Sequence, residues 1–282
     1  MTAKRFGVIG GDKRQKYLIE SLYQDGHELF VSGFDDLSEN EHIRKKSLKD
    51  ISDECDYVVL PVPVSSDFKT INAPYSLTPI IMDDEFKNLF QENVIFCGIS
   101  SRLGMKDNMK VFDYAAQESF AIKNAVPTVE GAVEIAMHES DITIHRSKCL
   151  VIGFGRLGKV LAKTLKDLGA NVTVSARKYS DFAWIKSSGY TCMNTHDING
   201  TYDFIFNTVP YMVLDRDTLK RCETKPLIID LASSPGGVDY GAADEFFIKT
   251  IKALAIPGKV SPKTAGEIIK YTIYELIEEN GL

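Results

Sequence analysis

Three glycines at the spacing GxGxxG form the clearest chemical signal in the sequence. They lie in residues 150–158, which read LVIGFGRLG between an apolar β-rich run and a run with helical spacing. In this context Gly153 permits a tight turn, Gly155 lets the backbone approach a pyrophosphate, and Gly158 lets helix and strand pack closely. The helix N-terminus adds free N–H groups and a positive dipole end. The segment therefore predicts a dinucleotide-binding turn, rather than a glycine turn of purely structural purpose.

The choice of dinucleotide is read about 20 residues further on, where an Asp or Glu would bind the ribose 2′-hydroxyl of NAD. Here the chain reads Ser175, Ala176, Arg177, Lys178, with no carboxylate. Two cations and a hydroxyl suit a 2′-phosphate, so the sequence favours NADP and keeps NAD as the alternative. We expect the glycine turn, this strand end and one later strand end to contact the cofactor. The predicted residues are Gly153, Phe154, Gly155, Arg156, Leu157, Gly158, Ser175, Arg177, Lys178, Asn207, Thr208 and Pro210.

A second glycine segment, residues 7–12, also joins a predicted strand to a predicted helix, but it lacks the three-glycine spacing. Asp12 suits the N-cap position of that helix. The other interpretation is that the turn binds a substrate carboxylate. The sequence leaves both interpretations open.

Composition excludes several classes of function. The 282 residues contain 33 Lys and Arg against 39 Asp and Glu, a net charge of −6, which argues against nucleic acid or an anionic membrane as a partner. The one short basic run, Arg44 to Lys46, is most simply a solvated face. No apolar run approaches the roughly 18 residues that span a bilayer, and the N-terminus resembles a strand more than a signal peptide, so we expect a cytoplasmic protein.

The five cysteines are widely spaced and form no CxxC pair. They therefore resemble neither a disulfide framework nor a zinc site, and we expect no metal. Four of them border or lie in apolar runs and are predicted to be buried.

Apolar β-rich runs alternate with helical segments along the whole chain, which is typical of parallel sheets covered by helices. The sequence predicts an α/β protein with two tandem doubly wound parallel-sheet domains, the second a Rossmann dinucleotide-binding domain. Predicted strands in the first half are residues 6–9, 28–32, 57–62, 94–99 and 110–112. Those in the second half are residues 148–152, 171–175, 204–207, 227–231 and 250–254.

Two helices are predicted to set the domain boundaries. Residues 125–137 carry Pro127 where the first turn of a linker helix would lie. Residues 262–279 carry an apolar stripe that must dock on something, and the first domain is one natural place. We therefore expect a first domain of residues 1–125 plus 258–282, and an inserted dinucleotide domain of residues 126–257.

Six motifs in order along the chain carry a family resemblance. They are VIGGDKRQ (residues 8–15), GIS (98–100), PTVEG (127–131), VIGFGRLG (151–158), DLASSPGG (230–237) and PKTAG (262–266). Together they resemble the family of the dipicolinate synthase A subunit over nearly the whole chain. One departure is Ser175, which stands where the family pattern Gly-Ala-Arg has its glycine, so the coenzyme choice stays open.

The resemblance implies an NAD(P)-dependent dehydrogenase that oxidises dihydrodipicolinate to dipicolinate in the mother cell of spore-forming bacteria. It also implies a complex with the flavoprotein-like B subunit of dipicolinate synthase, and an architecture similar to D-2-hydroxyacid and alanine dehydrogenases. A homo-oligomer is left open.

A ring dicarboxylate requires cations or N–H donors near both carboxylates. Thr128 and Thr264 are expected in first helical turns, where free N–H groups gather. The predicted substrate-binding residues are Arg14, Ser100, Ser101, Thr128, Lys263 and Thr264, with Arg102 and Lys123 as further cations at suitable positions. Each cation has the alternative of being ordinary surface charge.

Hydride loss makes the substrate ring aromatic, so positioning could supply most of the catalysis. None of the five histidines stands in a recognisable catalytic spacing. Glu130 is the candidate proton acceptor or substrate orienter, against the alternative of charge compensation at a helix N-terminus. Thr128 and Lys263 complete the predicted catalytic set.

Two other functions remain open at this stage. One is a different 2-hydroxy or 2-amino acid dehydrogenase, although residues 255–259 lack the histidine that D-2-hydroxyacid dehydrogenases carry before the terminal helix. The other is a nucleotide-binding subunit without catalytic activity of its own.

Overall fold

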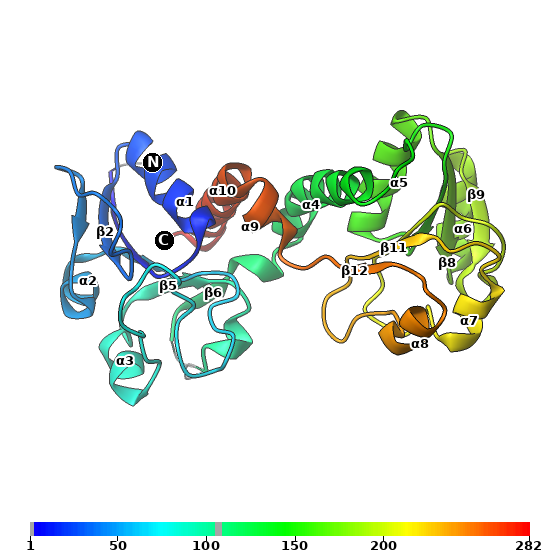
Figure 1. Ribbon diagram of the computed structural model, residues 1–282. Helices are drawn as coiled ribbons and strands as arrows, with labels where there is room; N and C mark the ends of the chain where they lie inside the picture. Colours follow the sequence, from blue (N-terminus) through cyan, green and yellow to red (C-terminus); the bar gives the residue numbers. More distant parts are fainter. Residues whose placement is uncertain (1–2, 105–108) are drawn as a thin grey trace. The chain divides into compact units, whose positions relative to one another are not determined.

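The computed structural model describes residues 3–104 and 109–282 (Figure 1). The chain divides into two compact units: unit 1 is Met1–Asn124 with Ser261–Leu282, and unit 2 is Ala125–Val260. Each unit holds a six-stranded parallel sheet flanked by helices. The predicted α/β class with two parallel-sheet domains is confirmed.

The sheet of unit 1 has the strand order β3-β2-β1-β4-β5-β6. Because the order reverses between β1 and β4, the switch point of this sheet lies beside the carboxyl end of β1. The strands are β1 (Arg5–Ile9), β2 (Glu28–Ser32), β3 (Ile43–Lys45), β4 (Tyr57–Val59), β5 (Val94–Cys97) and β6 (Val111–Asp113). The helical elements are α1 (Lys13–Gln24), α2 (Leu48–Glu54), α3 (Asp84–Leu89), η1 (Ser100–Arg102) and η2 (Tyr114–Ala116).

The sheet of unit 2 has the order β12-β11-β10-β7-β8-β9, which is the same topology as that of unit 1. Its strands are β7 (Lys148–Ile152), β8 (Asn171–Ala176), β9 (Thr191–Asn194), β10 (Phe204–Asn207), β11 (Leu227–Asp230) and β12 (Thr250–Lys252). Its helical elements are α5 (Arg156–Asp167), α6 (Tyr179–Ser187), η3 (Thr195–Asp197), α7 (Arg216–Arg221), α8 (Tyr240–Glu245) and α9 (Ile256–Val260). The switch point lies beside the carboxyl end of β7, where the glycine turn begins.

Helix α4 (Glu118–His138) corrects the prediction of a linker helix that begins near Pro127. Pro127 lies inside α4, and the helix begins at Glu118. A proline inside a helix removes one N–H donor and leaves the carbonyl four residues earlier without its usual partner. The preference of proline for a first turn was therefore a misleading signal here, and Thr128 does not lie at a helix N-terminus.

Helix α10 (Pro262–Asn280) packs against α1, and Figure 1 shows the two helices side by side. Its predicted apolar stripe is buried, and Ile268, Ile269, Ile273, Leu276 and Ile277 belong to the core of unit 1. The Lys270 ammonium donates to the Asp25 carboxylate at 2.6 Å, and only 4% of Lys270 is exposed. The last helix thus packs on unit 1 through its apolar stripe.

Two short strands were not predicted, β3 and β9. They are the outermost strands of their sheets, and β3 carries the exposed Arg44 and Lys45. Charged side chains on an edge strand discourage pairing with another chain. The basic run is solvated, as predicted, but it forms a strand.

Four of the five cysteines are buried, as predicted, and Cys192 is partly exposed. Within the described residues, no helix is both long and apolar enough to cross a membrane.

Candidate functional site

The glycine turn after β7 leaves no room for side chains at two of its three glycines. Gly153 has φ +97°, and a Cβ atom added there would lie 2.6 Å from the Thr208 hydroxyl oxygen. A Cβ atom added at Gly158 would lie 2.1 Å from the Gly153 carbonyl oxygen. Strand, turn and helix are therefore packed as closely as a dinucleotide-binding turn requires.

The third glycine, Gly155, is open. It is the N-cap of α5 and is exposed, and a Cβ atom added there would meet nothing within 4 Å. Among the described residues, no side chain caps this helix N-terminus. An uncapped N-terminus that begins at an exposed glycine fits a pyrophosphate, because backbone N–H groups and the helix dipole both favour an anion. The residues present thus fit a dinucleotide cofactor.

At the end of β8, the two predicted cations are exposed, but the predicted hydroxyl of Ser175 is not. Arg177 and Lys178 are exposed just beyond the strand, where a ribose 2′-substituent would lie. Ser175 is fully buried, and its hydroxyl accepts a hydrogen bond from Thr195 at 3.4 Å. The Ser175 side chain is therefore enclosed by the protein, which leaves only its backbone for the predicted contact with the cofactor.

Two polar side chains at the end of β10 form hydrogen bonds within the protein. The Asn207 amide nitrogen donates to the Val209 carbonyl at 3.1 Å and to the Asp230 carboxylate at 2.8 Å, while its amide oxygen accepts the Val209 N–H at 3.1 Å. Asn207 is fully buried, and its side chain holds the loop that follows β10. Thr208 donates to the Ile152 carbonyl at 2.8 Å, and Pro210 is exposed.

Asp230, at the end of β11, is a buried carboxylate that begins the DLASSPGG motif but is not among the predicted site residues. It accepts hydrogen bonds from Asn207, from the Tyr240 hydroxyl at 2.7 Å, and from the Ala232 and Gly237 N–H groups at 3.3 and 3.4 Å. It has no ion-pair partner among the described residues. Burial and the bond to Asp230 raise the pKa of Tyr240 well above its usual range, so this hydroxyl stays a donor. In the sequence, the signal for this residue is an Asp that ends an apolar strand a few residues before a Gly-Gly pair.

In unit 1, the turn after β1 has the N-cap that the first of its two interpretations predicts. Asp12 is the N-cap of α1 and forms a capping box with Gln15, whose side chain accepts the Asp12 N–H. The Arg14 guanidinium donates to the Asp12 carboxylate at 2.8 Å and to the Val62 carbonyl, and 12% of its side chain is exposed. This arginine is largely committed to the protein.

Other predicted substrate residues lie near the same end of α1. An added Cβ atom at Gly266 would meet the Arg14 carbonyl oxygen at 2.5 Å, while Lys270 binds Asp25 at the far end of α1, so α10 runs parallel to α1. The first turn of α10, with the exposed Lys263 and Thr264, therefore lies near the N-terminus of α1. The α10 N-terminus has no side-chain cap among the described residues.

Ser100 and Ser101 follow β5 at the carboxyl edge of the same sheet. The Ser100 N–H donates to the Asp113 carboxylate at 2.7 Å, and Ser101 is exposed. Lys123 pairs with Glu275 of α10, which also accepts a hydrogen bond from Ser119. Lys123 is therefore a structural cation.

Thr128 and Glu130 lie in the part of α4 that belongs to unit 2. Glu130 is exposed and lies more than three turns after the start of α4, so charge compensation at a helix N-terminus does not explain it. Its neighbour Gly131 faces α9, because an added Cβ atom would lie 2.2 Å from Ile256.

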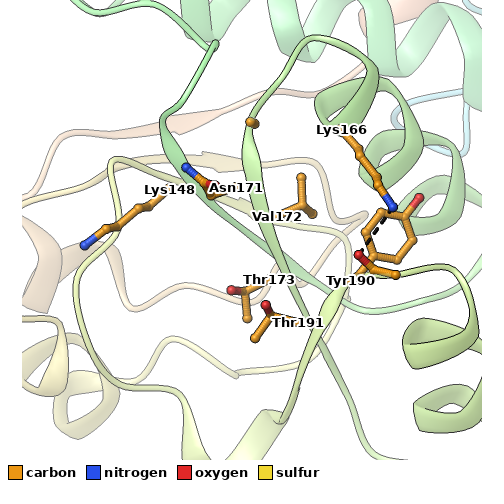
Figure 2. A pocket seen from close by; sticks show the side chains of 9 residues that line it. Lys148, Lys166, Asn171, Val172, Thr173, Tyr190 and Thr191 are labelled. Carbon is orange, nitrogen blue, oxygen red and sulfur yellow. Dashed lines mark hydrogen bonds between the residues drawn. The ribbon is translucent and has the colours of Figure 1, made fainter.

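A groove of about 410 Å³ in unit 2 lies away from the predicted dinucleotide site (Figure 2). Lys148, Asn171 and Thr191, which line it, are the first residues of their strands, so the groove lies at the opposite sheet edge from the glycine turn. Figure 2 shows Lys166 beside Tyr190; its ammonium lies 4.9 Å from the ring centroid and donates to the Ser188 carbonyl. The other lysine of the groove, Lys148, donates to the Thr201 hydroxyl at 2.9 Å. Both lysines thus bind within the protein, and we do not assign the groove to the cofactor.

Comparison with known proteins first defines the class. Residues 124–235 match the model of the D-isomer specific 2-hydroxyacid dehydrogenase NAD binding domain. Together with the open glycine turn, this makes unit 2 a nicotinamide dinucleotide-binding domain and the chain a dehydrogenase-type protein.

The family follows from the rest of the chain. Residues 5–115 match the model of the N-terminal domain of the dipicolinate synthase A subunit. The dipicolinate synthase A subunit of Bacillus subtilis (strain 168) is 33% identical, over 99% of this chain and 97% of the relative. The chain belongs to the family of the dipicolinate synthase A subunit, and the resemblance carried by the six motifs is confirmed.

Two solved structures of this family are similar to the chain over nearly its whole length. The A chain of dipicolinate synthase from Bacillus subtilis has a TM-score of 0.87 at 32% identity, covering 99% of this chain and 97% of that one. The dipicolinate synthase A subunit from Bacillus halodurans has a TM-score of 0.87 at 28% identity, covering 97% of each chain.

Proposed function

We propose that this chain oxidises dihydrodipicolinate to dipicolinate, with NADP+ as hydride acceptor, in a complex with the flavoprotein-like B subunit of dipicolinate synthase. The reaction would serve spore formation, in the cytoplasm of the mother cell. The single observation that carries the proposal is the uncapped N-terminus of α5 behind an open Gly155, in a chain of this family. NAD+ is the alternative coenzyme.

Unit 2 supplies the coenzyme-binding residues. The backbone of residues 153–158 would bind the pyrophosphate, and Arg177 and Lys178 would bind a 2′-phosphate. The side chains of Phe154 and Leu157 pack in the core of unit 2, so these residues would contribute backbone only. The bound coenzyme supplies a nicotinamide C4 that accepts hydride. Thr208 and Pro210 follow β10, at the end of the sheet where the nicotinamide would lie, and Asn207 with Asp230 holds their loop in place.

Unit 1 supplies donors for the two substrate carboxylates. The first turn of α10 offers backbone N–H groups together with Lys263 and Thr264. Ser100 and Ser101 add hydroxyls at the same sheet edge, and Arg14 adds one edge of its guanidinium.

The substrate loses one hydride and one proton to become the aromatic pyridine. Because aromatisation drives the reaction, the residues act mainly by orientation, with Lys263 and Thr128 as orienting groups. Glu130 is the proposed proton acceptor. We expect Glu130→Gln to lower turnover at least about tenfold with coenzyme affinity unchanged. Glu134→Gln, one turn later on α4, serves as the control. Equal turnover in both variants would show that Glu130 takes no part in the reaction.

One assay tests the whole proposal. The purified chain, with and without its partner subunit, is mixed with dihydrodipicolinate and NADP+ or NAD+, and the absorbance of pyridine dicarboxylate is followed. Product formed only when both proteins are present assigns the activity to the complex. Coenzyme binding without product under any combination favours a nucleotide-binding subunit, and coenzyme reduction by a 2-hydroxy or 2-amino acid would identify a different dehydrogenase.

A further inference from the structure

A long irregular segment follows β4 in unit 1. Residues 60–83 lead from the carboxyl end of β4 to the start of α3 without a helix or a named strand, and all of them are described. Loops of this length inside compact domains are uncommon and usually carry function. This segment starts at the sheet edge where Ser100 and the N-terminus of α1 also lie.

Phe68 is the unusual residue of this segment. Its backbone has φ +63°, in the left-handed region that non-glycine residues rarely adopt, and 65% of the residue is exposed. A bulky aromatic residue gains nothing for folding from a disfavoured backbone and a solvent-exposed ring. Such strain persists only where the surroundings enforce it, and it clusters at functional sites.

A tight hydrogen-bonded turn enforces the position of Phe68. The buried Ser65 hydroxyl accepts the Phe68 N–H at 3.0 Å and donates to the Asp67 carboxylate at 3.0 Å. The same carboxylate accepts the N–H groups of Lys69 and Thr70 at 2.9 and 2.8 Å. The backbone that carries the exposed ring is therefore preorganised.

A guanidinium lies beside the ring. The central carbon of Arg102 is 5.6 Å from the Phe68 ring centroid, and its Nη1 donates to the Ser65 carbonyl at 2.9 Å. Arg102 is partly exposed and forms no ion pair with any described residue. A planar donor array beside an aromatic face suits a flat ring that bears a carboxylate.

The segment also links this arginine to Arg14. Arg14 donates to the Val62 carbonyl, Arg102 donates to the Ser65 carbonyl, and the Val64 N–H between them donates to the Gly98 carbonyl. Both guanidinium groups are thus held against four consecutive residues, at the sheet edge proposed for the dicarboxylate.

Phe247 in unit 2 also has a positive φ and an exposed ring, but the end of a helix explains its backbone. It too has a positive φ, +56°, is 81% exposed and has a cation, Lys225, 5.0 Å from its ring. However, it directly follows the C-cap of α8, and the N–H groups of Phe247 and Ile248 donate back to Asp244 and Ala243 of that helix. A left-handed residue there terminates the helix, and Phe68 has no such helix before it.

We propose that Phe68 and Arg102 form a subsite for the substrate of the proposed function, on which this inference rests: the Phe68 face binds the flat ring, and Arg102 binds one carboxylate. The subsite selects a planar ring over a puckered saturated ring, and a dicarboxylate over a monocarboxylate. Arg102 and Phe68 would thereby decide which acid the enzyme accepts.

Titration calorimetry with stable probes tests the subsite. The probes are pyridine-2,6-dicarboxylate, pyridine-2-carboxylate and piperidine-2,6-dicarboxylate, added to the chain with NADP+, in the absence and in the presence of its partner subunit. We expect Phe68→Leu to weaken binding of pyridine-2,6-dicarboxylate about tenfold and to remove the preference for the planar ring. Arg102→Gln should instead remove the preference for two carboxylates over one. Phe247→Leu, the matched control, should change neither ratio.

Phe68→Asn is a second variant that reports the strain itself. Asparagine tolerates the left-handed region, so the melting temperature should stay equal or rise while dicarboxylate binding weakens. Suppose that the wild-type chain binds pyridine-2,6-dicarboxylate and that Phe68→Leu and Arg102→Gln both keep the wild-type selectivity ratios. That result would overturn the subsite and leave the proposed function standing. A wild-type chain that binds NADP+ but none of the three acids, even with its partner subunit, would overturn both.

Discussion

The two units share one sheet topology and differ at the helix that follows the first strand of each sheet. In both, a glycine with positive φ follows the strand, Gly10 in unit 1 and Gly153 in unit 2, and the helix N-cap comes two residues later. In unit 1 that N-cap is Asp12, whose carboxylate already binds the free N–H groups of α1. In unit 2 it is Gly155, and the N-terminus of α5 is open.

The third position of each helix reinforces the difference. Gln15 in unit 1 folds back over Gly11, where an added Cβ atom would lie 2.4 Å from the Gln15 side chain. Gly158 holds the corresponding position in unit 2 and lets the turn pack on the helix. The same fold therefore makes a closed, self-capped helix start in one unit and an anion site in the other, and side chains at two positions decide which.

The largest expected effect comes from closing the open site. Gly155→Asp would give α5 the cap that α1 has and place a carboxylate where the pyrophosphate binds. Because φ at Gly155 is −80°, the substitution requires no unusual backbone. We expect coenzyme affinity to fall at least about a hundredfold through like-charge repulsion, with an equal or higher melting temperature. Fluorescence titration with NADPH measures the affinity.

Gly155→Ala is the control for that variant. Its added methyl group meets no protein atom within 4 Å and adds bulk, but no charge, where the pyrophosphate would approach. It should therefore weaken binding less than Gly155→Asp does. If both variants bound coenzyme as tightly as the wild type, the comparison between the two helix starts would be wrong.

The next effect concerns the end of β8. Replacing Arg177 and Lys178 together by Gln removes the two exposed cations and should weaken NADP+ binding about tenfold to a hundredfold, with little change for NAD+. The ratio of the two dissociation constants is the measurement. A double variant with an unchanged ratio would show that the cations are ordinary surface charge, and Lys186→Gln on α6 is a matched control.

Opening the closed helix start should have a smaller effect. Asp12→Ala removes the cap of α1 and the partner of Arg14, and we expect unit 1 to lose about 1 kcal/mol of stability in urea unfolding. Coenzyme binding should be unchanged, since unit 2 holds that site. Loss of coenzyme binding in a folded Asp12→Ala chain would contradict the assignment of roles to the two units.

The smallest effect is a pH dependence carried by unit 1. His27 accepts the Lys4 N–H through Nδ1 and pairs with the Tyr274 hydroxyl through Nε2, so the folded protein holds it neutral. Burial lowers the pKa of His27, outweighing the opposing charge of Asp25. The unfolded chain thus binds a proton more readily, and stability should fall as the pH drops below about 6.5.

Urea unfolding of unit 1 at pH 7.5 and 5.5 measures this dependence. His27→Gln keeps an acceptor without a titrating ring and should flatten it. Burial raises the pKa of Asp25, but hydrogen bonds from Lys270 and Tyr274 outweigh it and lower the pKa below its usual value. Protonation of Asp25 near pH 4 and below should therefore destabilise the α1–α10 contact further. A wild-type chain equally stable at pH 7.5 and 5.5 would show that His27 does not contribute.

Local patterns predicted most of the strands and the dinucleotide turn, because a parallel strand is a continuous apolar run and a glycine turn has few alternatives. Edge strands such as β3 are short and polar, so they carry no such signal. Pro127 misled for a related reason: its preference for first turns is statistical, while buried neighbours such as Ala125 and Val129 keep α4 continuous through it.

The sequence by itself determined the fold class, the glycine turn and the apolar face by which the last helix is buried, since each depends on residues close together in the chain. Only the tertiary structure decided which polar side chains remain available. Asn207 and Ser175 look like ligand-binding residues in the sequence, yet Asp230 and Thr195, from other strands and loops, occupy them. Phe68 looks like an ordinary loop residue until its turn and the distant Arg102 are seen around it. Availability is set by hydrogen-bond partners that are remote in sequence, and only the folded chain brings them together.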